Sequence, residues 1–312
     1  MLSTSCALVS AAQAPTTVAQ RSVHKRNAAE VLLTGWRRIA DDRFVVTARW
    51  PPGHAFYAVR DHRHDPLLLT ETIRQSFPLL AHEAYGVPFG HHLVWDSFTW
   101  CLNPDLLRAD GSAAELELRV TAREVVRRRE NVVALSLAYD VVRHGRPLAT
   151  AVSRFTIQAP AVYRRLRGDH GDLAAVRPIP VPPAVDARHV GRTDAGDVVL
   201  SPADAPHRWQ LRVDTDHPTL FDHPVDHAPG MLLLEAVRQA AHAVSERTPV
   251  SVIAMDVRFH RYAELDAPSW VEARRTGSDV VGRPRLAVTC SQADGELFSC
   301  TVTLDEEPRG AA

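Results

Sequence analysis

Two short segments of the chain carry the same acidic, basic and amide residues at the same spacing. Residues 67–75 read LLLTETIRQ and residues 231–239 read MLLLEAVRQ, so each has Glu, Arg and Gln at positions i, i+3 and i+4. On a helix with about 3.6 residues per turn these side chains share one face. The two stripes are Glu71, Arg74 and Gln75 in the first segment, and Glu235, Arg238, Gln239 and His242 in the second.

Each stripe combines a candidate proton acceptor with a cation that can hold a phosphate or polarise a carbonyl group. A solvent-exposed ion pair on a helix surface is the ordinary alternative. Large apolar residues beside the stripe, and its recurrence in both halves, favour a polar face buried at a junction between two domains. A partly desolvated Glu235 or Glu71 could then act as a general base, with a pKa that depends on whether burial or the Arg charge dominates.

Histidines lie in the Pro- and Asp-rich segments before both helices, residues 61–66 and 222–230. Their spacing matches no recurring zinc pattern, so we expect no metal ion. His223 or His227 could serve as a general base or oxyanion donor near a helix N-terminus, where backbone N–H groups polarise a carbonyl. A histidine that only braces the loop is the competing interpretation.

Hydrophobic periodicity predicts the elements that position these residues. Alternating or β-rich runs follow the first helix at 92–102, 115–128, 131–143 and 148–158, and the second at 250–260, 269–276, 284–291 and 296–304. Each half therefore reads as a strand, a helix and four antiparallel strands. This is the α+β plan of a double hotdog, in which each long helix packs on a curled antiparallel sheet. Two halves in one chain predict an intramolecular pseudo-dimer with its sheets joined edge to edge, which also protects sheet edges.

Composition suggests where the domains begin and end. We expect a disordered tail over 1–25, hotdog domains over 26–165 and 196–306, and a tail over 307–312. The segment RPIPVPP at 177–183 cannot sustain helix or sheet, and it predicts a stiff linker over 166–195. Pro78 is expected to kink the first helix or to end it near Phe77.

Charge and motif content exclude several classes of function. The chain of 312 residues has a formal net charge of -1 and a pI of about 7.0, which favours neither nucleic acid nor an acidic membrane. No apolar run approaches the roughly 20 residues needed to span a bilayer. Four cysteines without paired spacing fit a reducing cytoplasm. The chain also lacks the glycine motifs of nucleotide-binding and α/β-hydrolase enzymes.

Several motifs, in order, resemble the A-factor biosynthesis hotdog family over most of residues 23–305. They are VHKR at 23–26, EVLLTGW at 30–36, ETIRQ at 71–75, GVP at 86–88, FDHPVDH at 221–227, PGMLLLEA at 229–236 and FHRYAELD at 259–266. The PGMLLLEA stretch also resembles hotdog dehydratases of fatty acid synthesis, whose catalytic Glu matches Glu235 and whose catalytic His is best matched by His223.

The resemblance implies an acyltransferase that joins a β-ketoacyl group from acyl carrier protein to the hydroxyl of dihydroxyacetone phosphate. This would be the first step toward a γ-butyrolactone, butenolide or furan signal. The residues expected to be catalytic are Glu235, Arg238, Glu71 and His223, with the second helix the preferred site. The residues expected to bind substrate are Arg74, Gln75, Gln239, His242 and His227.

No cofactor is expected, and a homodimer remains open. Two alternatives also remain. One is a hotdog dehydratase or thioesterase acting on thioesters of acyl carrier protein or coenzyme A, and the other is a non-catalytic regulator that binds an acyl ligand.

Overall fold

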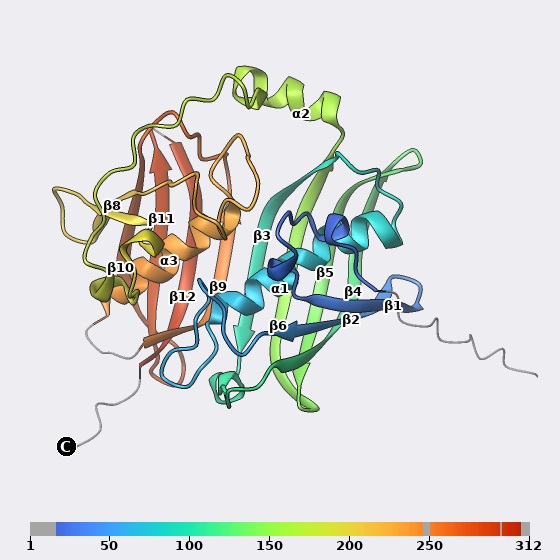
Figure 1. Ribbon diagram of the computed structural model, residues 1–312, viewed down its shortest axis with the longest axis horizontal. Helices are drawn as coiled ribbons and strands as arrows, with labels where there is room; N and C mark the ends of the chain where they lie inside the picture. Colours follow the sequence, from blue (N-terminus) through green and yellow to red (C-terminus); the bar gives the residue numbers. More distant parts are fainter. Residues whose placement is uncertain (1–16, 246–249, 294, 307–312) are drawn as a thin grey trace, which may run out of the picture.

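A single sheet of twelve antiparallel strands forms the body of the protein (Figure 1). The computed structural model describes residues 17–245, 250–293 and 295–306. The first half contributes β1 (Leu33–Ala40), β2 (Arg43–Trp50), β3 (His92–Leu102), β4 (Ala114–Arg128), β5 (Asn131–Arg143) and β6 (Arg146–Gln158). The second half contributes β7 (Leu200–Pro202), β8 (Arg208–Leu211), β9 (Val250–Phe259), β10 (Ser269–Ser278), β11 (Pro284–Gln292) and β12 (Gly295–Glu306).

The strand order shows that the two halves share one topology. The order is β1-β2-β4-β5-β6-β3 in the first half and, mirrored, β9-β12-β11-β10-β8-β7 in the second. The halves meet where β3 pairs with β9 in antiparallel register, from Ser97 opposite Arg258 to Cys101 opposite Ala254. The predicted double hotdog and its edge-to-edge pseudo-dimer are thus confirmed. The prediction of one strand before each helix was wrong, because a pair of strands precedes each long helix.

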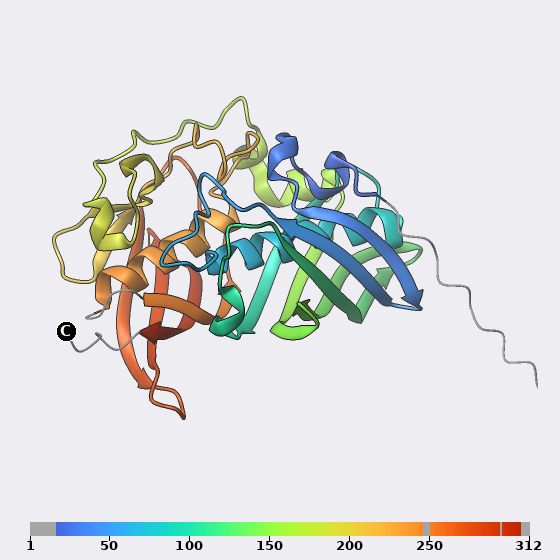
Figure 2. The ribbon, with the colours of Figure 1, turned by 60° about the horizontal axis from the view of Figure 1, so that its bottom comes forward.

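Two long helices, α1 (Pro66–Leu79) and α3 (Gly230–Val244), lie on the face around which the sheet curls (Figure 2). Asp65 caps α1, since its side chain accepts a hydrogen bond from the Leu67 backbone N–H. Helix α1 continues past Pro78 to Leu79, and a π-helical turn follows over Leu80–Ala84. Pro78 has no N–H to donate, and the wider turn accommodates the missing bond close to the predicted end.

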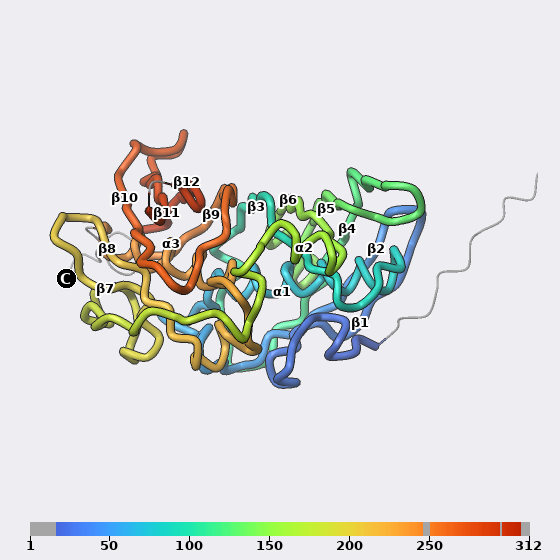
Figure 3. Tube along the Cα trace, turned by 90° about the horizontal axis from the view of Figure 1, so that it is seen from above, coloured from blue at the N-terminus to red at the C-terminus, as the bar shows by residue number. Residues whose placement is uncertain are grey.

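A short helix, α2 (Pro160–Arg167), leads into the connection between the halves. Seen from above, the chain after α2 crosses from the first half toward β8 (Figure 3). Residues 173–186 contain no regular structure, as the prolines predict. Within the described residues, no helix is both long and apolar enough to cross a membrane.

Matching 3-10 turns lie at the start of the two halves. The first turn is Gln20–Val23 and its counterpart is Ala187–Val190. A residue in the left-handed conformation follows each turn, His24 in the first half and Gly191 in the second. Val23 and Val190 are fully buried, so we propose that the first domain begins before residue 26 and the second before residue 196. Residues 1–16 and 307–312 of the predicted tails lie outside the described residues.

Candidate active site

The predicted stripes are buried ion pairs rather than exposed ones. Glu71 and Glu235 are 1% and 0% exposed. Arg74 donates from Nε and Nη2 to the two carboxylate oxygens of Glu71, at 2.8 and 2.7 Å. Arg238 binds Glu235 in the same way and at the same two distances. The structure therefore excludes the alternative of a solvated helix face for both carboxylates.

A second cation, from the segment that begins each half, completes each cluster. Lys25 Nζ lies 3.1 Å from Glu71 Oε1. Arg192 occupies the equivalent place after Gly191, with its Nη2 2.8 Å from Glu235 Oε2. Sequence reasoning missed both partners, because it placed Lys25 in a tail and Arg192 in a linker. The sequence did contain one signal for the first partner, because Lys25 is the only lysine in the chain.

Gln75 and Gln239 hold these starting segments to the helices. Gln75 accepts from the Leu32 N–H and donates to the Glu30 carbonyl and to Glu71. Gln239 makes the matching bonds, with its Oε1 accepting from the Val199 N–H. Both amides are buried and make these hydrogen bonds within the protein, so we propose a structural role for them in place of substrate binding.

A cavity of about 490 Å³ opens between the two halves, beside the first stripe. Its volume is in the range that holds a small-molecule ligand. Four of the predicted site residues line it, namely Glu71, Arg74, His223 and His227. The cavity has a cationic end, formed by Lys25 and Arg74, whose charges interact with the carboxylates of Glu71 and Asp222.

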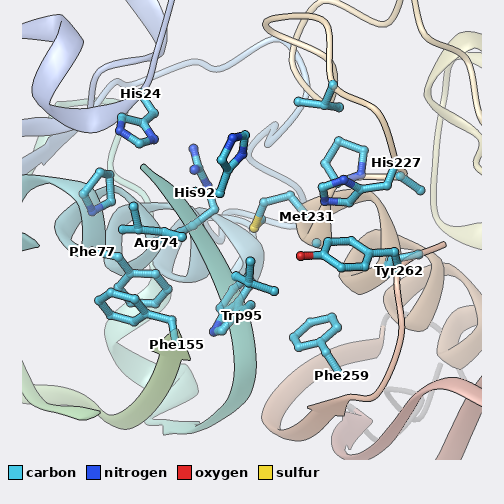
Figure 4. A pocket seen from close by; sticks show the side chains of 18 of the residues that line it. His24, Arg74, Phe77, His92, Trp95, Phe155, His227, Met231, Phe259 and Tyr262 are labelled. Carbon is cyan, nitrogen blue, oxygen red and sulfur yellow. The ribbon is translucent and has the colours of Figure 1, made fainter. Parts of the chain in front are cut away.

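One side of the cavity is aromatic (Figure 4). This aromatic floor consists of Phe77, Phe155, Trp95 and Phe259. Phe77 stacks on Phe155 at 4.9 Å between ring centroids, and Trp95 stacks on Phe259 at 5.3 Å. Trp95 is on β3 and Phe259 on β9, so the floor spans the joint between the halves. Imidazoles line the opposite side in Figure 4, and the arrangement suits a molecule with an apolar tail and a polar, anionic head.

Two of the cavity histidines belong to the loop before α3. His223 Nδ1 lies 3.5 Å from Asp222, and burial lowers the pKa of this imidazole. His227 Nδ1 lies 2.6 Å from Asp226 Oδ1. The first turn of α3 also lines the cavity through Gly230 and Met231, and Pro229 at its N-cap makes no side-chain capping hydrogen bond.

Protein side chains fill the region around the second stripe. Arg192 donates to the Phe56 carbonyl, and its guanidinium stacks on the Phe56 ring with Cζ 4.0 Å from the centroid. Arg60 donates to the Gly191 carbonyl, and a Cβ on Gly191 would lie 2.6 Å from the His242 ring. None of the predicted residues Glu235, Arg238, Gln239 and His242 lines the cavity.

The position of the cavity therefore favours the first helix as the candidate site, whereas the sequence favoured the second. Burial alone would raise the pKa of Glu235, but the charges and hydrogen bonds of Arg192 and Arg238 hold it well below its ordinary value. Burial would likewise raise the pKa of Glu71, but Arg74 and Lys25 hold it well below its ordinary value. Both side chains are firmly ionised and are weak proton acceptors, so they are better suited to hold cations than to act as bases.

Comparison with known proteins finds relatives that are similar over most of the chain. It is 42% identical over 297 residues to a 2-oxo-3-(phosphooxy)propyl 3-oxoalkanoate synthase of Streptomyces virginiae, covering 95% of this chain and 99% of the relative. A synthase of the same name from Streptomyces coelicolor is 41% identical over 280 residues, with 89% and 88% covered.

Two solved thioesterases share the fold at low sequence identity. The 12:0-ACP thioesterase of Umbellularia californica has a TM-score of 0.52 and 11% identity, covering 84% of this chain and 98% of that one. An acyl-ACP thioesterase of Bacteroides thetaiotaomicron has a TM-score of 0.51 and 8% identity, with the same coverage. The family model of the A-factor biosynthesis hotdog domain matches residues 6–159 and 173–305. The chain is a member of the A-factor biosynthesis hotdog family.

Proposed function

We propose that the protein transfers a β-ketoacyl group from acyl carrier protein to the hydroxyl of dihydroxyacetone phosphate. The product would be a 2-oxo-3-(phosphooxy)propyl 3-oxoalkanoate, the compound for which the Streptomyces relatives are named. The ester would then lead toward γ-butyrolactone or related signals. The observation that carries the proposal is one cavity with an aromatic floor and a cationic end.

The aromatic floor would hold the acyl chain. Its four rings line one wall, and Met231 and Leu233 of α3 extend the apolar surface. Burying a chain of several methylene groups there would contribute about 0.8 kcal/mol for each. This contribution depends on the length of the acyl chain. It needs no charged partner, which suits an uncharged 3-oxoalkanoyl group.

The cationic end would bind the phosphate of the alcohol. Arg74 is the more accessible cation, with 24% of its side chain exposed, whereas the Lys25 side chain is 4% exposed. Glu71 fixes both cations, so little conformational freedom is lost when an anion arrives. Glu71 is then a positioning residue, and Arg74 is the direct phosphate ligand.

The test is mass spectrometry of the purified protein with a medium-chain β-ketoacyl carrier protein, with and without dihydroxyacetone phosphate. A phosphate-bearing ester, or its cyclised product, formed only with both substrates would support the proposal. Thioester consumption that is independent of the alcohol would instead indicate a thioesterase or dehydratase. A tightly bound but unchanged acyl donor would indicate a regulator.

Arg74→Gln tests the phosphate assignment. Loss of a charge-assisted hydrogen bond of about 1.5–3 kcal/mol should raise the KM for dihydroxyacetone phosphate roughly 10- to 100-fold. The KM for the acyl donor should stay the same. Arg128→Gln, on the exposed β4–β5 hairpin, is the matched control and should leave both KM values unchanged. An unchanged KM for the alcohol in Arg74→Gln would contradict the assignment.

A further inference from the structure

The loop before α3 contains two Asp-His pairs, and only one is tight. Asp222 uses its carboxylate to accept hydrogen bonds from the backbone N–H groups of Arg26 and Asn27, at 2.6 and 2.9 Å. Its contact with His223, at 3.5 Å, is at the limit of a hydrogen bond. Asp226 and His227 are 2.6 Å apart. The first pair anchors the loop, and the second is a hydrogen-bonded dyad.

Residues of α2 hold Asp226 in place from the other half of the chain. The Tyr163 hydroxyl lies 2.7 and 2.8 Å from the two carboxylate oxygens of Asp226, and Arg167 Nε donates to Oδ2 at 3.2 Å. Arg167 also donates to Glu264 at 2.7 Å, and Glu264 forms a backbone bridge with His227. Burial alone would raise the pKa of Asp226, but His227, Tyr163 and Arg167 hold it well below its ordinary value.

An ionised Asp226 determines which nitrogen of His227 carries the proton. A carboxylate only accepts, so Nδ1 of His227 must donate to it. In the neutral ring Nε2 then keeps its lone pair. Among the described residues, none hydrogen-bonds to Nε2, and the ring lines the cavity (Figure 4). His227 therefore has the orientation and tautomer of a general base.

Tyr262 places an unused donor beside this imidazole. Its hydroxyl is buried and has no hydrogen-bond partner among the described residues. The Tyr262 ring meets the His227 ring edge-on at 4.7 Å, and Figure 4 shows the hydroxyl pointing into the cavity. Burial raises the pKa of Tyr262 to about 12, so the hydroxyl keeps its proton. An unpaired buried hydroxyl costs about 1–3 kcal/mol, which a ligand oxygen would recover.

We propose that His227 is the general base of acyl transfer and that Tyr262 donates a hydrogen bond to the oxyanion formed on the thioester carbonyl. Asp226, Tyr163 and Arg167 are positioning residues that act through His227. This inference rests on the proposed function for the identity of the nucleophile. It makes the connection between the two halves part of the catalytic arrangement, since α2 supplies two of the positioning residues.

The step balances without any further reactant. His227 Nε2 takes the hydroxyl proton of the alcohol as the oxygen attacks the thioester carbon, and a C–O bond forms. The tetrahedral intermediate carries its negative charge on the former carbonyl oxygen, opposite the Tyr262 hydroxyl. Collapse breaks the C–S bond, and the imidazolium returns the proton to the leaving thiolate. Asp226 stays ionised throughout and stabilises the imidazolium.

The main test compares His227→Gln with His170→Gln in the full-length protein. General-base catalysis contributes about 10²- to 10⁴-fold, so His227→Gln should lower kcat by at least 100-fold. His170 forms an exposed pair with Asp266 at 3.6 Å, away from the cavity, and its variant should keep wild-type turnover. A His227→Gln variant with more than a tenth of wild-type kcat would overturn the proposal. So would a loss of turnover in His223→Gln that exceeds the loss in His227→Gln.

Two further variants separate catalysis from folding. Tyr262→Phe keeps the ring and should lower kcat about 10²- to 10³-fold, as removal of one oxyanion donor does. Asp226→Asn removes the charge that stabilises the imidazolium, so the acid limb of the kcat/KM profile should move to lower pH. A purely structural role for Asp226 would reduce the folded fraction and leave that limb in place, which would contradict the dyad.

The wild-type protein, assayed in the same series, distinguishes two kinds of failure. If it forms the ester and His227→Gln does too, the dyad is wrong and the proposed function stands. If it only hydrolyses the thioester, the proposed function is wrong. Loss of that hydrolysis in His227→Gln and Tyr262→Phe would then still assign the base and the oxyanion donor.

Discussion

Glu235→Gln should destabilise the protein much more than Glu71→Gln, although the two stripes share their sequence spacing. The substitution keeps the shape of the side chain and removes its charge. In the second stripe it leaves the guanidinium groups of Arg192 and Arg238 facing a neutral amide, with side chains that are 0% and 5% exposed. In the first stripe it leaves Lys25 and Arg74, and Arg74 adjoins the cavity, where water can solvate it.

The expected magnitudes follow from this difference in solvation. Removing one partner of a buried ion pair costs about 3–5 kcal/mol, because the remaining charge stays buried without a counter-charge. Glu235→Gln should reach at least the middle of that range, since both of its cations are buried and neither lines the cavity. Glu71→Gln should cost about 1–3 kcal/mol, the penalty for hydrogen bonds lost at a site that water reaches. The two variants should differ by roughly 2 kcal/mol.

Urea denaturation followed by circular dichroism measures this difference through the shift in the midpoint at constant m. Glu115→Gln is the control, because the Glu115–Arg49 pair is well exposed and should contribute less than about 1 kcal/mol. Equal losses for Glu71→Gln and Glu235→Gln would refute the argument that the second site is closed and the first is open. A loss below about 1 kcal/mol for Glu235→Gln would refute the buried network itself.

Three other predictions concern packing and pH. Gly230→Ala would place a Cβ 2.9 Å from the Trp95 ring. It should lower the unfolding free energy by about 1–3 kcal/mol in a denaturant titration and weaken acyl-chain binding in a ligand titration. Gly191→Ala combines a positive φ with a Cβ 2.6 Å from His242, and it should lower the melting temperature without changing the KM for either substrate. Burial, with a neighbouring arginine charge, lowers the pKa of His64 to about 4, so the unfolded chain takes up this proton near pH 6.5 and the folded protein only near pH 4. The stability linked to His64 is therefore present above pH 6.5 and is lost as the pH falls toward 4. Between pH 4 and 6.5, His64→Phe should lower the slope of the unfolding free energy against pH by up to about 1.4 kcal/mol per pH unit. An unchanged slope would contradict the assignment.

The amino-acid sequence alone determined the architecture. Strand positions follow from local alternation of apolar residues, and eight of the predicted strand ranges agree with the structure to within a few residues. The repeated Glu, Arg and Gln predicted two equivalent helices and therefore a double hotdog. These features depend on neighbours within one or two turns or strands, and that information is present in the order of residues.

Only the tertiary structure decided which copy of the stripe faces the cavity. Around Glu235, Arg192 together with Phe56 and Arg60 of the first half closes the space, whereas a cavity remains beside Glu71. The dyad of Asp226 and His227 likewise depends on α2, which precedes it by about sixty residues. Burial, hydrogen-bond partners and pKa depend on contacts between segments that are far apart in the chain, and local patterns do not contain them.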